Sequence, residues 1–158
     1  MTNRELQPSP RKAFRGLLVF FMTAFPLPAQ EREDQKDPKK AIRAVLDAQV
    51  TAWNKGDLRG FMEGYWHSPD LSFFSGKDKT KGWQATLERY QKKYQTEGRE
   101  MGKLSFSEIE IEILSADHAL VKGRWQLVLK KETPGGLFTL IIKKMAPGWR
   151  IVHDHTSS

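Results

Sequence analysis

The sequence predicts an α+β domain in which helices pack on one face of a curved antiparallel sheet. Between residues 39 and 95, apolar side chains recur at three- and four-residue steps, which is the spacing of amphipathic helices. From residue 108 onward they alternate with polar ones, and turns containing Gly and Pro separate the alternating stretches, as in strands joined by hairpins. Helices followed by consecutive hairpins are typical of α+β domains. With 158 residues, the chain has room for one domain of this kind.

The first two helices are expected to follow one another closely. The first covers about residues 39–54, and Gly56 lies in the stop that follows it. Asp57 then occupies an N-cap position, where a carboxylate accepts hydrogen bonds from free backbone amides. Apolar residues at helical spacing extend the second, shorter helix to Trp66.

A short aromatic strand and a third helix complete the first half. The strand covers residues 71–74, and residues 76–81, which are mostly charged, are expected to form a loop. Gly82 opens the third helix, which runs to about residue 95 and carries its apolar residues in one stripe.

The second half is expected to consist of long strands. Residues 108–114 alternate between Glu and Ile, with apolar residues at odd positions, whereas the apolar positions just upstream are even. A bulge near Ser107 is needed to keep both sets on one face. The next strand turns alternate residues inward, namely Ala119, Val121, Gly123, Trp125, Leu127 and Leu129. Two further strands follow at residues 137–145 and 149–156.

The N-terminal segment has the layout of a secretory signal peptide. Three basic residues precede an apolar run at residues 16–25, and an exit containing Pro and Ala ends at Ala29. The run is shorter than the ~20 residues that a stable transmembrane helix needs. The expected division is a signal peptide at 1–29, a polar linker at 30–37 and the domain at 38–158. We expect a periplasmic or secreted protein without stable membrane insertion after cleavage; an uncleaved anchor is the alternative.

Composition narrows both the chemistry and the partners. The chain has no cysteine, which excludes disulfides, thiol nucleophiles and thiolate metal sites. Lys and Arg number 26 against 19 Asp and Glu, a net charge of +7, but part of this excess lies in the N-terminal segment and the rest in scattered pairs. Binding to nucleic acid requires a concentrated basic face. We therefore expect no nucleic-acid partner.

Three stretches resemble a known superfamily. Residues 52–57 (AWNKGD), Gly82 and residues 148–157 (GWRIVHDHTS) resemble the nuclear transport factor 2-like superfamily, and within it the SnoaL-like group that includes ketosteroid isomerase homologues. The last stretch is also similar to the end of the association domain of calcium/calmodulin-dependent kinase II. The resemblance implies a cone-shaped fold, with three N-terminal helices against a curved sheet, a cavity open at one end and a homodimer built through the sheets.

The strands themselves also favour a homodimer. Their outward positions include Leu120 and Val128, and on the third long strand either Ile141 or the set Phe138, Leu140 and Ile142. This is more apolar surface than a solvated sheet face normally shows.

Large aromatic residues are candidates for the walls of the cavity. The candidate ligand-binding residues are Trp53, Tyr65, Trp66, Trp83, Trp125, His153 and His155. Aromatic walls with a few polar groups are usual for small-molecule sites, although rings at helical spacing also fill cores. Gly123, which lacks a side chain, would leave room for a ligand beside them. We expect a small-molecule ligand and no cofactor.

His153 and His155 are also the candidate catalytic residues. They share one parity of the last strand with Trp149 and Ile151, so a regular strand would turn all four toward the cavity. The two rings could hydrogen-bond a ligand, act as a general base, or hold a metal together with His67. Hydrogen-bonded histidines at a strand end are the structural alternative. No third ligand is close in sequence, so we expect no metal.

An exported module that binds a small molecule is the first functional hypothesis. An enzyme of the ketosteroid isomerase or polyketide cyclase type, working by acid–base chemistry, is the alternative. The resemblance implies a carboxylate base with a Tyr and a protonated acid for such isomerases. This set cannot be assigned here, because Asp154 has the parity opposite to His153 and His155. A third option is an assembly module, as the resemblance to the kinase association domain implies.

Overall fold

The structure, a computed structural model, describes residues 37–157; the predicted signal peptide and residues 30–36 of the predicted linker lie outside this range. The helices are α2 (Pro38–Asn54), α3 (Leu58–Met62) and α4 (Trp83–Tyr94). The strands are β1 (Ser72–Ser75), β2 (Asp78–Lys81), β3 (Lys103–Ile113), β4 (His118–Val128), β5 (Gly135–Met145) and β6 (Gly148–Thr156). None of these helices is long and apolar enough to cross a membrane.

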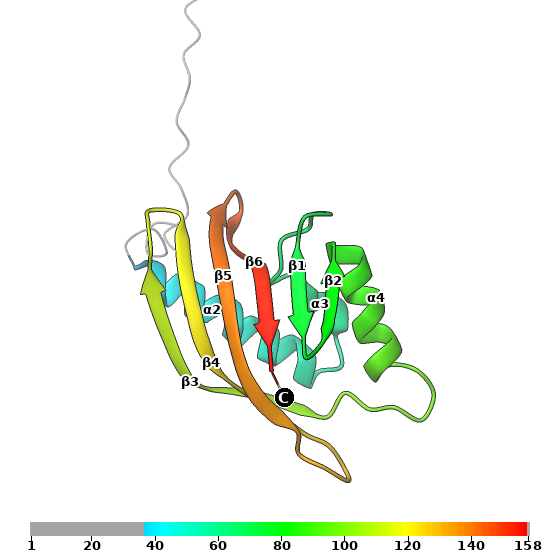
Figure 1. Ribbon diagram of the computed structural model, residues 1–158. Helices are drawn as coiled ribbons and strands as arrows, with labels where there is room; N and C mark the ends of the chain where they lie inside the picture. Colours follow the sequence, from blue (N-terminus) through cyan, green and yellow to red (C-terminus); the bar gives the residue numbers. More distant parts are fainter. Residues whose placement is uncertain (1–36, 158) are drawn as a thin grey trace, which may run out of the picture.

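One curved sheet carries the fold, and all three helices lie on the same side of it (Figure 1). The six strands have the order β2-β1-β6-β5-β4-β3. Neighbouring strands are antiparallel except β1 and β6, which are parallel. The predicted α+β architecture is therefore confirmed, with one parallel pair in the sheet. We call the sheet face toward the helices the inner face and the opposite one the outer face.

Side-chain caps fix where the first two helices begin. The Asp37 carboxylate accepts from the backbone amides of Lys39 and Lys40 at 3.0 and 3.1 Å, which starts α2. The Asp57 carboxylate accepts from the backbone amide of Gly60 at 2.8 Å. The prediction that Asp57 is an N-cap is thereby confirmed.

Helix α3 is shorter than predicted because its C-terminal continuation pairs with β6. The backbone amide of Trp66 donates to the carbonyl of Ile151 at 2.9 Å, and the amide of Ile151 donates to the carbonyl of Gly64 at 2.9 Å. These bonds hold Tyr65 in an isolated bridge with Ile151. The segment after Met62 is therefore tied to the sheet, and the side chain of Tyr65 has a fixed position.

The expected loop at residues 76–81 contains strand β2, so this prediction was wrong. Strand β2 forms a hairpin with β1 around Gly76, whose φ of 57° suits a residue without a side chain. It is an edge strand with mostly exposed residues, which explains why its sequence lacks an apolar alternation.

The predicted bulge in β3 is confirmed. The register between β3 and β4 shifts between Ser107 and Glu110, and Glu108 has a positive φ of 51°. The bulge places both apolar sets of β3 against the core. The most deeply buried core side chains include Ile42, Leu46, Met62, Leu71, Val121, Leu127, Ile142 and Ile151.

Candidate functional site

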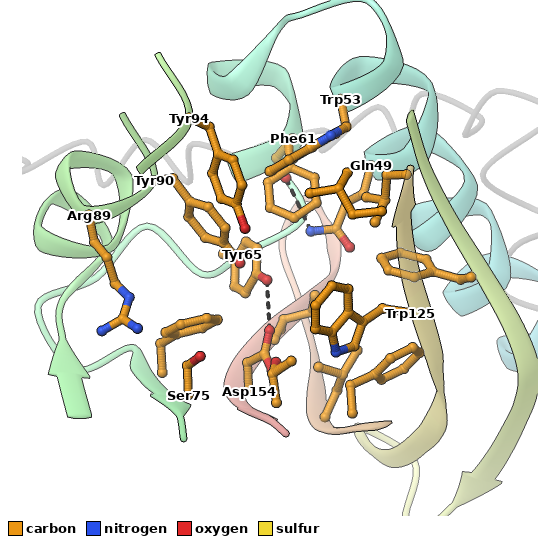
Figure 2. Close-up of a pocket in the computed structure, with 18 of the residues that line it drawn as sticks. Gln49, Trp53, Phe61, Tyr65, Ser75, Arg89, Tyr90, Tyr94, Trp125 and Asp154 are labelled. Atoms are coloured by element: carbon orange, nitrogen blue, oxygen red, sulfur yellow. Dashed lines mark hydrogen bonds between the residues drawn. The ribbon is translucent and has the colours of Figure 1, made fainter. Parts of the chain in front are cut away.

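An aromatic cavity lies between the inner face of the sheet and the helices (Figure 2). Its walls include the rings of Trp53, Phe61, Tyr65, Tyr90, Tyr94 and Trp125. The space inside that is accessible to water is about 90 Å³, which is small beside the roughly 300–1,000 Å³ of common ligand pockets. The cavity therefore has room only for a small molecule.

Two tryptophans of the cavity wall donate their N–H groups to backbone carbonyls outside the cavity. The indole of Trp53 donates to the backbone carbonyl of Met101 at 2.9 Å. The indole of Trp125 donates to the backbone carbonyl of Ser157 at 3.0 Å. Both rings are therefore fixed in orientation and offer apolar surface to a ligand.

Asp154 is the carboxyl group of this cavity, and both of its oxygens are hydrogen-bonded. The hydroxyl of Tyr65 donates to Oδ2 at 2.7 Å, as Figure 2 shows, and the hydroxyl of Thr156 donates to Oδ1 at 2.7 Å. Asp154 is only 5% exposed. All three residues line the cavity, so this hydrogen-bonded set is its polar centre.

Burial raises the pKa values of the carboxyl group and of the nearby tyrosines. It raises the pKa of Asp154 to about 6, against the opposing effect of the hydrogen bonds from Thr156 and Tyr65. Burial, followed by the nearby Asp154 charge, raises the pKa of Tyr65 and of Tyr90 well above the ordinary value. The tyrosines therefore remain hydroxyl donors at neutral pH, while Asp154 exchanges its proton close to neutrality.

A β-bulge in the last strand brings Asp154 to the inner face. Ile151 pairs with Ile142 of β5, but His153 pairs with the adjacent Ile141, so Val152 is an extra residue in β6. One extra residue reverses the parity of everything that follows it. Ile151 thus packs into the core, and after the bulge Asp154, not His153, faces the cavity.

The expectation that His153 and His155 face the cavity was therefore wrong. Nδ1 of His153 lies 2.6 Å from the hydroxyl oxygen of Ser72, and both imidazoles contact the ring of Phe74 at centroid distances of 5.0 and 6.1 Å. Both histidines therefore lie on the outer face of the sheet, whereas Asp154 lies on the inner face. Burial, followed by the charge of His155, lowers the pKa of His153.

Three of the predicted aromatic wall residues, Trp53, Tyr65 and Trp125, do line the cavity, and two do not. Trp83 is 2% exposed and donates its N–H to the carbonyl of Met62, so it belongs to the core. Trp66 is not among the cavity residues.

The expectation that Gly123 leaves room for a ligand was also wrong. The ring of Phe138 occupies the space above Gly123, with its nearest atom only 2.5 Å from the position of an added Cβ, so no room is left there for a ligand. His67 stacks on Trp83 at a centroid distance of 4.1 Å. Within residues 37–157, no three His, Cys, Asp or Glu side chains are grouped so that they could hold a metal.

Helix α4 supplies cavity residues that were not named as site candidates from the sequence. Tyr90, Tyr94, Arg89 and Lys93 all line the cavity. The apolar stripe of the predicted helix contained both tyrosines, and this was their only signal. Arg89 and Lys93 gave none, because basic residues on a helix usually form its solvated face.

A curved sheet with three helices on one side and an acid-bearing aromatic cavity between them defines a domain of the nuclear transport factor 2-like class. The chain belongs to the SnoaL-like domain family, whose model matches residues 42–158. A comparison with curated proteins found no match.

Solved structures agree with this assignment and with the resemblance seen in the sequence. A nuclear transport factor 2-like protein of unknown function from Shewanella oneidensis is 41% identical, with a TM-score of 0.73 over 77% of this chain and 100% of that chain. A ketosteroid isomerase-like protein from Erwinia carotovora is 22% identical (TM-score 0.58, 75% and 93% covered). A protein from Thiobacillus denitrificans that resembles the calcium/calmodulin-dependent protein kinase type II association domain is 24% identical (TM-score 0.61, 73% and 92%). The last two show the shared fold.

Proposed function

We propose that this protein binds a small molecule in the cavity, with a polar group of the ligand at Asp154 and Tyr65. The observation that carries the proposal is a buried carboxyl group, held by two hydroxyls at 2.7 Å, in a cavity whose other walls are mostly aromatic and aliphatic. Burying a carboxyl group is costly, so an apolar residue would serve a purely structural role better. Retaining the acid supports a role in recognising a ligand.

Acid–base catalysis by Asp154 is the second candidate function. A carboxyl group with a pKa of about 6 can take up and release a proton near neutral pH. Isomerisation, cyclisation or dehydration of a bound molecule would use Asp154 as the base, in place of His153 or His155. The fold shared with a ketosteroid isomerase-like protein is compatible with this candidate.

Native mass spectrometry of the protein purified from its own host tests the binding proposal. We expect a bound small molecule that is released on denaturation. Asp154→Asn and Tyr65→Phe should weaken its binding by about tenfold, because each removes a hydrogen bond in a dry site. His155→Gln, on the outer face, is the matched control and should bind as the wild type does. Equal binding by all four proteins would contradict the assignment of the site.

Once the bound molecule is identified, incubation with the wild-type protein separates the two candidate functions. Release of the molecule unchanged favours binding alone. A product that forms with the wild type but not with Asp154→Asn would establish catalysis, since the amide cannot accept a proton in the same way.

Export is also part of this proposal. The basic residues, the apolar run and the exit at Ala29 support cleavage of residues 1–29. The protein isolated from the native host should begin near Gln30 and be recovered from the periplasm or the medium. An intact Met1 in a cytoplasmic fraction would show that the segment does not act as a cleaved signal.

We further propose a homodimer through the outer face of the sheet. Leu120 and Ile141 are cross-strand partners on this face, whereas Phe138, Leu140 and Ile142 of the same strand are buried on the inner face. Val128 and Leu137 on the outer face are 47% and 53% exposed. Covering such apolar side chains favours association. Light scattering at micromolar concentration should give twice the mass of one chain, and a monomer mass would reject the dimer.

A further inference from the structure

Two cations stand beside the tyrosines of the cavity. Arg89 and Lys93 are four residues apart on α4, as are Tyr90 and Tyr94, so the helix presents a row of two cations next to a row of two rings. All four side chains line the cavity. Lys93 is exposed and Arg89 half-buried, which places the positive charge at the rim, while Asp154 is buried.

We propose that the ligand of this cavity is a small aryl carboxylate, whose ring lies against the two tyrosines and whose anionic group binds Arg89 and Lys93. This inference rests on the proposed binding function and names the chemical class of the ligand. It also predicts the orientation of the ligand, with the anion at the rim and any hydroxyl or carbonyl group at Asp154 and Tyr65.

The guanidinium of Arg89 has donors left for an anion. Its Nη2 lies 3.4 Å from the carboxylate of Asp78, and its Nη1 lies 3.4 Å from the hydroxyl oxygen of Thr80. Both distances exceed the ~2.7–2.9 Å of a strong charged hydrogen bond. The Asp78 side chain is itself 59% exposed, so solvent screens this pair. A bound carboxylate could therefore accept two N–H groups of Arg89 in better geometry.

The position of Arg89 is fixed by an aromatic ring of the cavity. Its guanidinium carbon lies 5.5 Å from the ring centroid of Phe73, which is 4% exposed and lines the cavity. This buried ring keeps water from one side of the guanidinium, and an anion that binds on that side is attracted more strongly than one at the open surface. The stacked cation thus forms one wall of the opening.

Lys93 adds a second positive charge one helical turn from Arg89. Two cations four residues apart on a helix repel one another. A carboxylate between Arg89 and Lys93 would remove this repulsion. Deeper in the cavity, the buried Asp154 carboxylate would repel a second anion, so a monoanion fits best.

Two matched pairs of compounds test the charge preference directly. Phenylacetate and benzoate carry the anion, while phenylacetamide and benzamide have nearly the same shape without it. Binding to the purified protein can be followed by NMR through the indole N–H signals of Trp53 and Trp125, both in the cavity wall. We expect each acid to bind at least about tenfold more tightly than its amide, as a charged hydrogen-bonded pair predicts.

Charge-removing variants show whether the preference comes from the rim. Arg89→Gln combined with Lys93→Gln should reduce the ratio of acid to amide affinity to near one while amide binding is retained. Lys55→Gln with Lys92→Gln removes the same charge at exposed residues outside the cavity walls and should keep the wild-type ratio. Equal binding of acid and amide to the wild type, or an equal loss in the control, overturns the inference and leaves the binding function standing. Failure of all four compounds to bind at millimolar concentration counts against the binding function as well.

Discussion

Replacing Asp154 by Asn is expected to stabilise the protein at pH 8 and to have little effect at pH 4. The pKa of Asp154 is raised from 3.8 to about 6, so the native state binds this proton more tightly than the unfolded state. The free energy of unfolding therefore falls as the pH rises from about 4 to 6, and it stays lower above that range. Because the pKa of Asp154 is higher in the native state by about 2, the free energy of unfolding is lower by about 3 kcal/mol at pH 8 than at pH 4. The Asn side chain is neutral at every pH and avoids this loss.

The hydrogen-bonding partners of Asp154 can adapt to the amide. Tyr65 can still donate to the remaining oxygen, and the hydroxyl of Thr156 can accept from the new NH₂ group. Urea unfolding of the wild type and the variant at pH 4, 6 and 8 measures the effect. Asp47→Asn, at an exposed position of α2, is the matched control for the loss of a carboxylate. A difference between wild type and Asp154→Asn that is the same at pH 4 and pH 8 would contradict the buried, raised-pKa carboxyl group.

A stabilising substitution at Asp154 would itself support the proposed function. Folded domains are stable by only about 5–15 kcal/mol, so a cost of a few kcal/mol at neutral pH is large. Residues that lower stability persist mainly where function needs them. The expected result is thus a more stable protein that binds its ligand less well.

The sequence predicted the helices, the long strands and one bulge, because each leaves a local signal. The spacing of apolar residues distinguishes the helices from the strands. The change from even to odd apolar positions near Ser107 predicted the bulge in β3. The edge strand β2 left no such signal, because its side chains are mostly exposed. Local patterns thus predicted the parts of the fold that bury one side of each element.

The site was only partly predictable, and the reason lies in one residue. Trp53, Tyr65 and Trp125 were expected in the cavity and line it. The bulge at Val152 gave no parity conflict in the sequence, because β-branched Val152 fits either face of a strand. His153 and Asp154 therefore exchanged faces between expectation and structure. A register shift of one residue changes the chemistry of a cavity without changing the fold.

Ile151→Ala is expected to cause a large loss of stability. Ile151 is 1% exposed, lies between the core and the cavity and joins the segment after α3 through its backbone. Removing its side chain leaves a cavity beside a site that is already partly empty, and we expect a cost of about 2–5 kcal/mol. Urea unfolding monitored by tryptophan fluorescence at pH 7 measures this value.

A substitution on the outer face of β6 is the control for this prediction. His155→Gln, on the same strand but exposed, should change the free energy of unfolding by less than about 0.5 kcal/mol. Because Ile151 is held to Gly64 and Trp66 by backbone bonds, the variant should keep the bridge that positions Tyr65. Ligand binding per folded molecule should then fall less in Ile151→Ala than in Asp154→Asn. Similar stability losses for Ile151→Ala and His155→Gln would mean that β6 turns a different set of residues to the core.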